Sequence, residues 1–75
     1  MFFFELPKDL DDHYILVLDP LLGTGSTVTM AIRLLLDHNI PQEKIIFINL
    51  ISSPQGVDMV TYTFPKVTLQ IWSVI

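Results

Sequence analysis

The residue types best suited to chemistry stand together in one run, Asp19 to Thr27, which reads Asp-Pro-Leu-Leu-Gly-Thr-Gly-Ser-Thr. This run follows the apolar segment 15–18 and precedes a segment with the apolar spacing of a helix. A loop of glycines and hydroxyl side chains at a helix start leaves backbone N–H groups unpaired beside the positive end of the helix dipole, and that arrangement binds phosphate. A carboxylate before the loop can accept hydrogen bonds from sugar hydroxyls. The run therefore predicts a site for a sugar phosphate.

The spacing in this run excludes three other well-known loops. A Walker A loop needs a lysine after its last glycine, and Ser26 follows Gly25 here. A dinucleotide fingerprint needs a third glycine where Val28 stands, with its acid well beyond the loop rather than before it. A nucleophile elbow needs one glycine two positions before its serine and another two positions after it, and Ser26 has neither. Two simpler interpretations stay open: the loop is only a capped strand-to-helix turn, and Asp19 is only a turn former before Pro20.

The stretch Leu18 to Ser26 resembles the phosphoribosyl-pyrophosphate (PRPP) loop of the type I phosphoribosyltransferases. More narrowly, it resembles the uracil phosphoribosyltransferases, which have Asp-Pro where most of the superfamily has two consecutive acids. The resemblance extends to about Leu69 and is carried by further stretches at 3–7, 47–51, 53–56 and 64–67.

The resemblance implies a transferase of pyrimidine salvage that moves the phosphoribosyl group of PRPP to uracil, giving UMP and pyrophosphate. It implies Mg²⁺ as the companion of PRPP. Positioning and electrostatics should matter more than a nucleophile for a transition state with oxocarbenium character, so we predict no catalytic side chain and no metal ligand. The predicted PRPP-binding residues are Asp19, Leu21, Leu22, Gly23, Thr24, Gly25, Ser26 and Thr27.

Two parts of the family pattern have no counterpart here: an upstream basic segment that contacts pyrophosphate and a carboxyl-terminal segment that reads the uracil edge. Residues 1–75 are therefore expected to form a partial domain, the PRPP-loop core, that is inactive alone. Uracil specificity rests on the resemblance only. The alternative is a non-catalytic module of the same fold that binds a sugar phosphate or associates with a partner.

The composition also suggests the interior of a larger unit. Hydrophobic residues make up 51% of the chain and charged residues 16%, with a mean hydropathy of +0.54. A net charge of −4 disfavours nucleic acid as a partner. The absence of cysteine fits a reducing compartment, and no apolar run is long enough to span a bilayer. We expect a cytoplasmic protein with no membrane partner, and a homo-oligomeric full-length parent.

The hydrophobic pattern predicts a three-layer α/β fragment with a parallel sheet and the order strand, helix, strand, helix, strand. Segments whose residues are almost all apolar predict buried strands, and segments whose apolar residues recur at helical spacing predict helices. The expected strands are 15–18, 44–51 and 67–72, and the expected helices are 28–36 and 57–64, with strand-like aromatics before them at 2–6.

Several local expectations follow from single residues. Pro20 should end the pairing of its strand. Thr24 or Ser26 is expected to cap the first helix, and Asn39 to end it in a left-handed conformation. The polar stretch 8–13, with acids at 9, 11 and 12, should be a solvated connection. The loop 52–56 either approaches the ligand through its serines or only starts the second helix.

Overall fold

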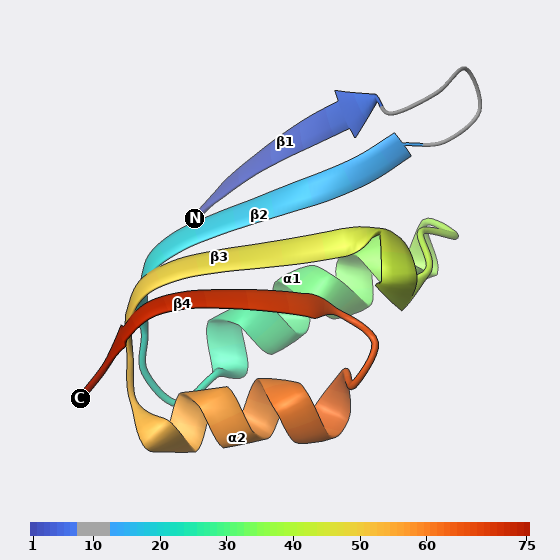
Figure 1. The fold of residues 1–75 in the computed structure, drawn as a ribbon. Coiled ribbons are helices and arrows are strands. Elements are labelled where there is room, and N and C mark those ends of the chain that lie inside the picture. Colours follow the sequence, from blue (N-terminus) through green and yellow to red (C-terminus); the bar gives the residue numbers. More distant parts are fainter. Residues whose placement is uncertain (8–12) are drawn as a thin grey trace.

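The computed structural model describes residues 1–7 and 13–75. The acids predicted to form a solvated connection at 9, 11 and 12 lie outside this described part. The order of elements agrees with the prediction (Figure 1). The elements are β1 (Phe2–Pro7), β2 (His13–Leu22), α1 (Ser26–Asp37), the short 3₁₀ turn η1 (Gln42–Lys44), β3 (Ile45–Ser52), α2 (Pro54–Thr63) and β4 (Thr68–Val74).

The strands form a four-stranded sheet whose order, β1-β2-β3-β4, follows the chain. Strands β2, β3 and β4 are parallel, as their nearly continuous apolar sequences predict. Strand β1 pairs antiparallel with β2 at the edge, with Phe2 opposite Leu18. The register of the central pair places Asp19 opposite Asn49. The α/β class is confirmed, with one antiparallel edge strand added to the parallel sheet.

Both helices cover the same face of the sheet, so the described chain has two layers rather than the expected three (Figure 1). The reason is topological. Each parallel crossover leads to the next strand in order, and crossovers of one hand then place their helices on one side. The core lies between this face and the helices; its buried apolar residues are Val17, Leu22, Val28, Ile32, Ile45, Phe47, Val60, Phe64 and Val67.

The opposite face, which we call the open sheet face, carries large apolar side chains without a covering layer. Phe2, Phe4 and Leu6 of β1 are 59%, 49% and 43% exposed, and Trp72 of β4 is 86% exposed. They share this face with Leu16, Leu18, Ile46 and Ile48 through the pairing register. The unusually high hydropathy of the chain thus has a structural counterpart.

The exposure of Trp72 can be checked by fluorescence. Because Trp72 is the single tryptophan of the sequence and is 86% exposed, dilute protein should emit as a water-exposed indole that iodide quenches strongly. The measurement is an emission spectrum with an iodide titration, and N-acetyltryptophanamide serves as the exposed reference. A blue-shifted emission that resists iodide would contradict the open sheet face.

The expectation that Pro20 ends strand pairing is wrong. Pairing skips Pro20, which has no N–H, but resumes with Leu21 opposite Ile51 and continues to the end of β2. The Asn49 side chain joins the strands at this interruption, because its Nδ2 donates to the Asp19 carbonyl at 2.9 Å and to the Ile51 carbonyl at 3.1 Å. A side-chain amide thus supports the sheet where the proline weakens it.

Only one of the two ends of α1 agrees with the prediction made from the sequence. Gly25, rather than Thr24 or Ser26, is the N-cap, with a φ of 90° and no side-chain cap bond. Glycine adopts this left-handed conformation without the steric cost of a Cβ. At the other end Asn39 has a φ of 65°, as predicted, and the His38 ring contacts the Leu34 carbonyl at 2.8 Å. None of the helices in the described ranges is long and apolar enough to cross a membrane.

Candidate functional site

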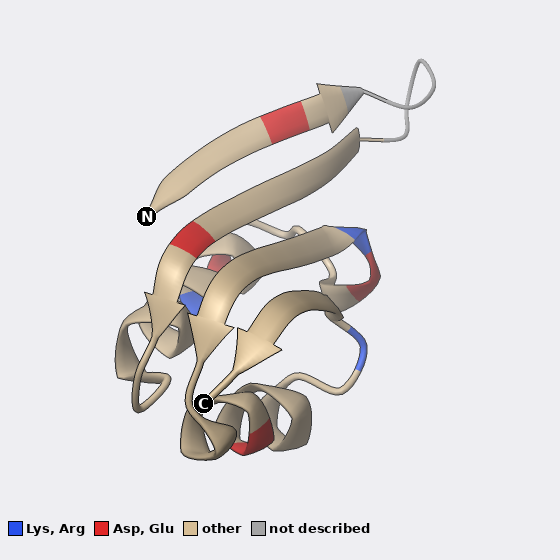
Figure 2. Ribbon diagram, turned by 60° about the vertical axis from the view of Figure 1, so that its left-hand side comes forward, with Lys and Arg blue, Asp and Glu red and all other residues tan. Residues whose placement is uncertain are grey.

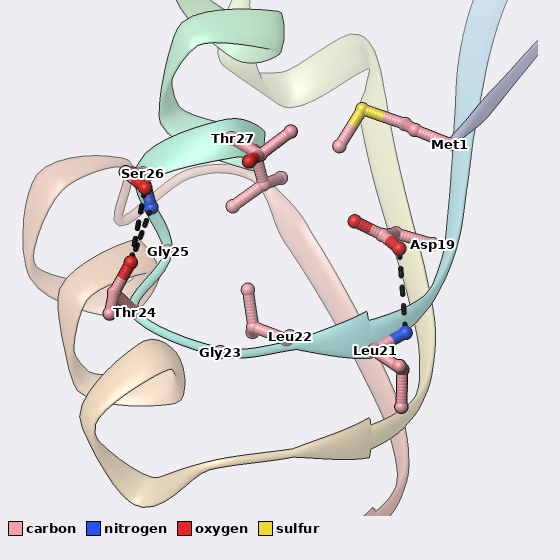
Figure 3. A pocket seen from close by; sticks show the side chains of 10 residues that line it. Met1, Asp19, Leu21, Leu22, Gly23, Thr24, Gly25, Ser26 and Thr27 are labelled. Atoms are coloured by element: carbon pink, nitrogen blue, oxygen red, sulfur yellow. Dashed lines mark hydrogen bonds between the residues drawn. The ribbon is translucent and has the colours of Figure 1, made fainter.

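A cavity of about 370 Å³ lies where β2 ends and α1 begins (Figure 3). The structure brings all the predicted binding residues together around it. Two further residues, Met1 and Val28, were not predicted. Val28 is the next residue of α1, whereas Met1 arrives through the antiparallel pairing of β1, which no sequence motif announces. The residues that line the cavity are Met1, Asp19, Leu21, Leu22, Gly23, Thr24, Gly25, Ser26, Thr27 and Val28.

The backbone of this loop offers several unpaired donors. In the described part of the chain, no acceptor is found for the N–H groups of Gly23, Thr24, Gly25, Thr27 and Val28. The groups of Thr27 and Val28 belong to the first turn of α1, where the helix itself supplies no partner. Converging N–H groups at the positive end of a helix of this length favour an anion.

The hydroxyl side chains of the loop gather at one end of the cavity. Thr24 Oγ1 and Ser26 Oγ are 3.0 Å apart, and Figure 3 shows both across the cavity from Asp19. Thr24 Oγ1 also accepts a long hydrogen bond, 3.4 Å, from the Ser26 N–H. Because both side chains are exposed, their hydroxyls can turn toward a bound ligand.

Asp19 supplies the single carboxylate among the residues that line the cavity. Its Oδ1 lies 3.4 Å from the Leu21 N–H, the local contact that the turn-forming interpretation requires. Its Oδ2 has no hydrogen-bond partner in residues 1–7 and 13–75, and Figure 3 shows the carboxylate directed into the cavity below Met1. The carboxylate therefore keeps acceptor capacity for a ligand while it supports the turn.

No lysine or arginine of the described residues lines the cavity. Lys44 precedes β3 and Lys66 precedes β4, so both lie at the opposite end of the sheet (Figure 2). Arg33 lies on α1 with its guanidinium over the Phe64 ring, 5.9 Å from the centroid. Among the described residues, amides and hydroxyls are thus the groups that could hold an anion in this cavity.

The serines at the end of β3 do not line the cavity. Ser53 is the N-cap of α2, and its Oγ accepts from the Gly56 N–H at 3.0 Å. Pro54 follows as the first helical residue, a position that suits proline. Ser52 is buried and donates its hydroxyl hydrogen bond to Asn49 Oδ1. Of the alternatives for this segment, helix initiation is the one that the structure shows.

The buried pair of Asn49 and Ser52 supports the strand end that carries Asp19. Asn49 is 1% and Ser52 0% exposed, so their polar groups are satisfied within the protein. A lone polar residue in the apolar run 45–51 was the sequence signal for this pair. Its partner could not be named before the register of β2 and β3 was known.

Replacing Asn49 by alanine should lower the free energy of unfolding by about 1–3 kcal/mol. The substitution removes the Asn49 partner of the half-buried Asp19 and Ile51 carbonyls and of the buried Ser52 hydroxyl. The measurement is urea unfolding. The matched control is Asn39→Gly, because Asn39 is exposed and already left-handed, and it should change stability by less than about 0.5 kcal/mol. Equal effects of both variants would contradict a supporting role for Asn49.

The model of the family described as uracil phosphoribosyltransferase matches residues 1–74. The chain belongs to the uracil phosphoribosyltransferase family. Similar family members include uracil phosphoribosyltransferase 2 of Schizosaccharomyces pombe, 45% identical over 92% of this chain and 31% of that protein. The uracil phosphoribosyltransferase of Dictyostelium discoideum is 44% identical over 84% of this chain and 29% of that protein.

Relatives with another name contain the same family segment. Uridine kinase-like protein 3 of Arabidopsis thaliana is 46% identical over 87% of this chain, which spans 14% of that protein. Among solved structures, the AQ2163 protein of Aquifex aeolicus matches with a TM-score of 0.69 and 27% identity, over 81% of this chain and 29% of that one. The chain spans less than a third of the length of each of these family relatives.

Proposed function

We propose that this chain forms the PRPP-binding core of a uracil phosphoribosyltransferase, which transfers the phosphoribosyl group of PRPP to uracil in pyrimidine salvage. The products are UMP and pyrophosphate. One observation carries the proposal: residues with unpaired N–H groups at the start of α1 line the same cavity as the Asp19 carboxylate. Amides suit the 5′-phosphate and a carboxylate suits ribose hydroxyls, so the cavity matches a ribose phosphate from both ends.

Binding and orientation are the contributions that these residues make to the reaction. The unpaired N–H groups of the loop and the first turn of α1, together with the hydroxyls of Thr24, Ser26 and Thr27, hold the 5′-phosphate. Asp19 accepts hydrogen bonds from the ribose hydroxyls and so fixes the ring. The bond between ribose C1 and pyrophosphate breaks while a bond from a uracil nitrogen to C1 forms. Fixing the ribose at both ends favours this displacement through proximity and orientation.

Magnesium would enter with PRPP. Residues 1–7 and 13–75 contain no group of three side chains able to hold a metal ion, and Asp19 is the one carboxylate that lines the cavity. Mg²⁺ is often bound by one carboxylate together with substrate phosphates, and the Asp19 carboxylate with the phosphates of PRPP would supply such ligands. When bound, it would neutralise charge on the departing pyrophosphate.

The second candidate is a non-catalytic module that binds a sugar phosphate or a partner. It is favoured by the uridine kinase-like relatives, in which a segment of this kind is a small part of a longer protein whose name carries another activity. The transferase and the sugar-phosphate-binding form of the module both require the cavity to bind a ribose phosphate. They differ in whether uracil is converted.

Calorimetric titration with PRPP, ribose 5-phosphate and inorganic phosphate tests the shared requirement. We expect PRPP and ribose 5-phosphate to bind more tightly than phosphate alone, because Asp19 adds contacts that phosphate cannot use. Incubation of the full-length parent with PRPP, uracil and Mg²⁺, followed by chromatography for UMP, separates the candidates, because residues 1–75 are expected to be inactive alone. UMP supports the transferase; binding by the parent without UMP favours the module. A chain that binds none of these ligands contradicts the transferase and the sugar-phosphate-binding module.

A further inference from the structure

Ser53 connects the start of α2 to the loop that lines the cavity, although it does not line the cavity itself. Its backbone N–H donates to the Leu22 carbonyl at 2.8 Å. Its hydroxyl donates to the Gly23 carbonyl and accepts from the Gly56 N–H at 3.0 Å. One residue from a distant part of the chain therefore holds two consecutive carbonyls of the loop.

These contacts determine where two loop amides point. In a trans peptide the N–H lies opposite the C=O of the same unit, and the described residues contain no cis peptide. Holding the Leu22 carbonyl therefore directs the Gly23 N–H away from Ser53. Holding the Gly23 carbonyl directs the Thr24 N–H away in the same manner. Gly23 and Thr24 both line the cavity, and within the described chain their N–H groups have no acceptor.

Close packing at the same carbonyl supports this arrangement. A Cβ on Gly56 would lie 2.4 Å from the Gly23 carbonyl oxygen and 2.8 Å from Leu22 Cγ. Real Cβ atoms do not approach backbone oxygen so closely, so glycine at this position lets α2 reach the loop. Gly56 also supplies the N–H that Ser53 Oγ accepts. The hydroxyl is thus held as acceptor from α2 and as donor toward the loop.

We propose that Ser53 is a positioning residue: it sets the orientation of the Gly23 and Thr24 N–H groups and thereby prepares the loop for a phosphate group. The value of this orientation for PRPP rests on the proposed function. The orientation itself does not. The sequence motif alone ties Ser53 to helix initiation, and the bond to the Gly23 carbonyl gives the same hydroxyl a second role.

The test compares Ser53→Gly and Ser53→Thr with Thr61→Ala. Glycine caps a helix nearly as well as serine but has no hydroxyl, whereas threonine keeps both the cap and the donor. Thr61 lies on α2, and its hydroxyl donates to the Val57 carbonyl at 2.7 Å. Thr61→Ala therefore removes one hydroxyl hydrogen bond from the same helix without affecting a contact to the loop. Residual dipolar couplings report the Gly23 and Thr24 N–H directions, titration with inorganic phosphate reports affinity, and thermal melting reports stability.

In Ser53→Gly we expect a changed coupling at Thr24, because the Gly23 carbonyl loses its donor, and a retained coupling at Gly23, because the backbone N–H of residue 53 still holds the Leu22 carbonyl. The dissociation constant for phosphate should rise roughly tenfold, with melting close to the unsubstituted protein. Ser53→Thr should restore the Thr24 coupling and the affinity, and Thr61→Ala should change neither. An unchanged Thr24 coupling in Ser53→Gly would overturn the proposal, as would unchanged affinity where the unsubstituted protein binds phosphate. If the unsubstituted protein binds no phosphate, the proposed function fails, and the couplings still decide whether Ser53 orients the loop.

Discussion

Replacing Gly25 by valine is expected to abolish binding of both PRPP and inorganic phosphate. Gly25 has a φ of 90°, a conformation that costs an ordinary residue about 1–2 kcal/mol and a β-branched one more. Its added Cβ would point at α2 rather than into the cavity, 3.3 Å from Met59 Cβ. The backbone at the N-cap of α1 must therefore change its conformation, and the neighbouring N–H groups that would hold the phosphate are displaced with it.

Calorimetry with PRPP and with phosphate measures this effect, after circular dichroism has shown that the variant is folded. Gly25→Asn is the matched variant, because asparagine tolerates the left-handed conformation while presenting the same Cβ to Met59. We expect it to retain part of the affinity. Full phosphate binding by Gly25→Val would show that the conformation of Gly25 is irrelevant to the loop.

Replacing Asp19 by alanine is expected to weaken PRPP binding roughly ten- to a hundredfold while affinity for inorganic phosphate stays nearly the same. The ribose hydroxyls lose a charge-assisted hydrogen bond, which contributes about 1.5–3 kcal/mol. The amides at the start of α1 remain, so a ligand without ribose is hardly affected. Asp19→Ala should thus lose affinity for PRPP alone, whereas Gly25→Val should lose affinity for both PRPP and phosphate.

The control for Asp19→Ala is Asp58→Ala. It removes the same charge from an exposed position on α2 outside the cavity lining, so it reports any effect of net charge alone. Calorimetric titration of both variants with PRPP and phosphate is the measurement. If Asp19→Ala binds PRPP as tightly as Asp58→Ala, Asp19 is only a turn residue, and the ribose part of the proposed function loses its support.

Much of the fold was predictable because the pattern is local. The apolar runs around Val17 and Phe47 predict parallel strands, and the helical spacing after Gly25 predicts α1; the structure shows these elements, although one face of the strands lacks a covering layer. The number of layers was not predictable in the same manner. It depends on the order of strands in the sheet, which no single segment contains. The continuation of β2 beyond Pro20 likewise depends on the Asn49 side chain of another strand.

The candidate site divides in the same way. Its lining is almost entirely one continuous run, so composition and spacing were enough to find it. The residues that support this lining come from elsewhere: Met1 through antiparallel pairing, Asn49 through register, and Ser53 with Gly56 through the close approach of α2. The sequence pattern predicts Gly56 in the loop before the second helix, whereas the structure has it in the first turn of α2, and what it approaches is a property of the folded chain.

Because strand order follows chain order, the sheet can be assembled in the direction of synthesis, each strand adding beside the one before. The hairpin of β1 and β2 needs only a short connection, whereas the parallel partner of β2 must close a much longer loop, which is slower. The run from Asp19 to Thr27 thus emerges well before Ser53 and Gly56, which hold it. We therefore expect competence to bind a ligand to be acquired late in folding, when β3 and α2 have joined the hairpin.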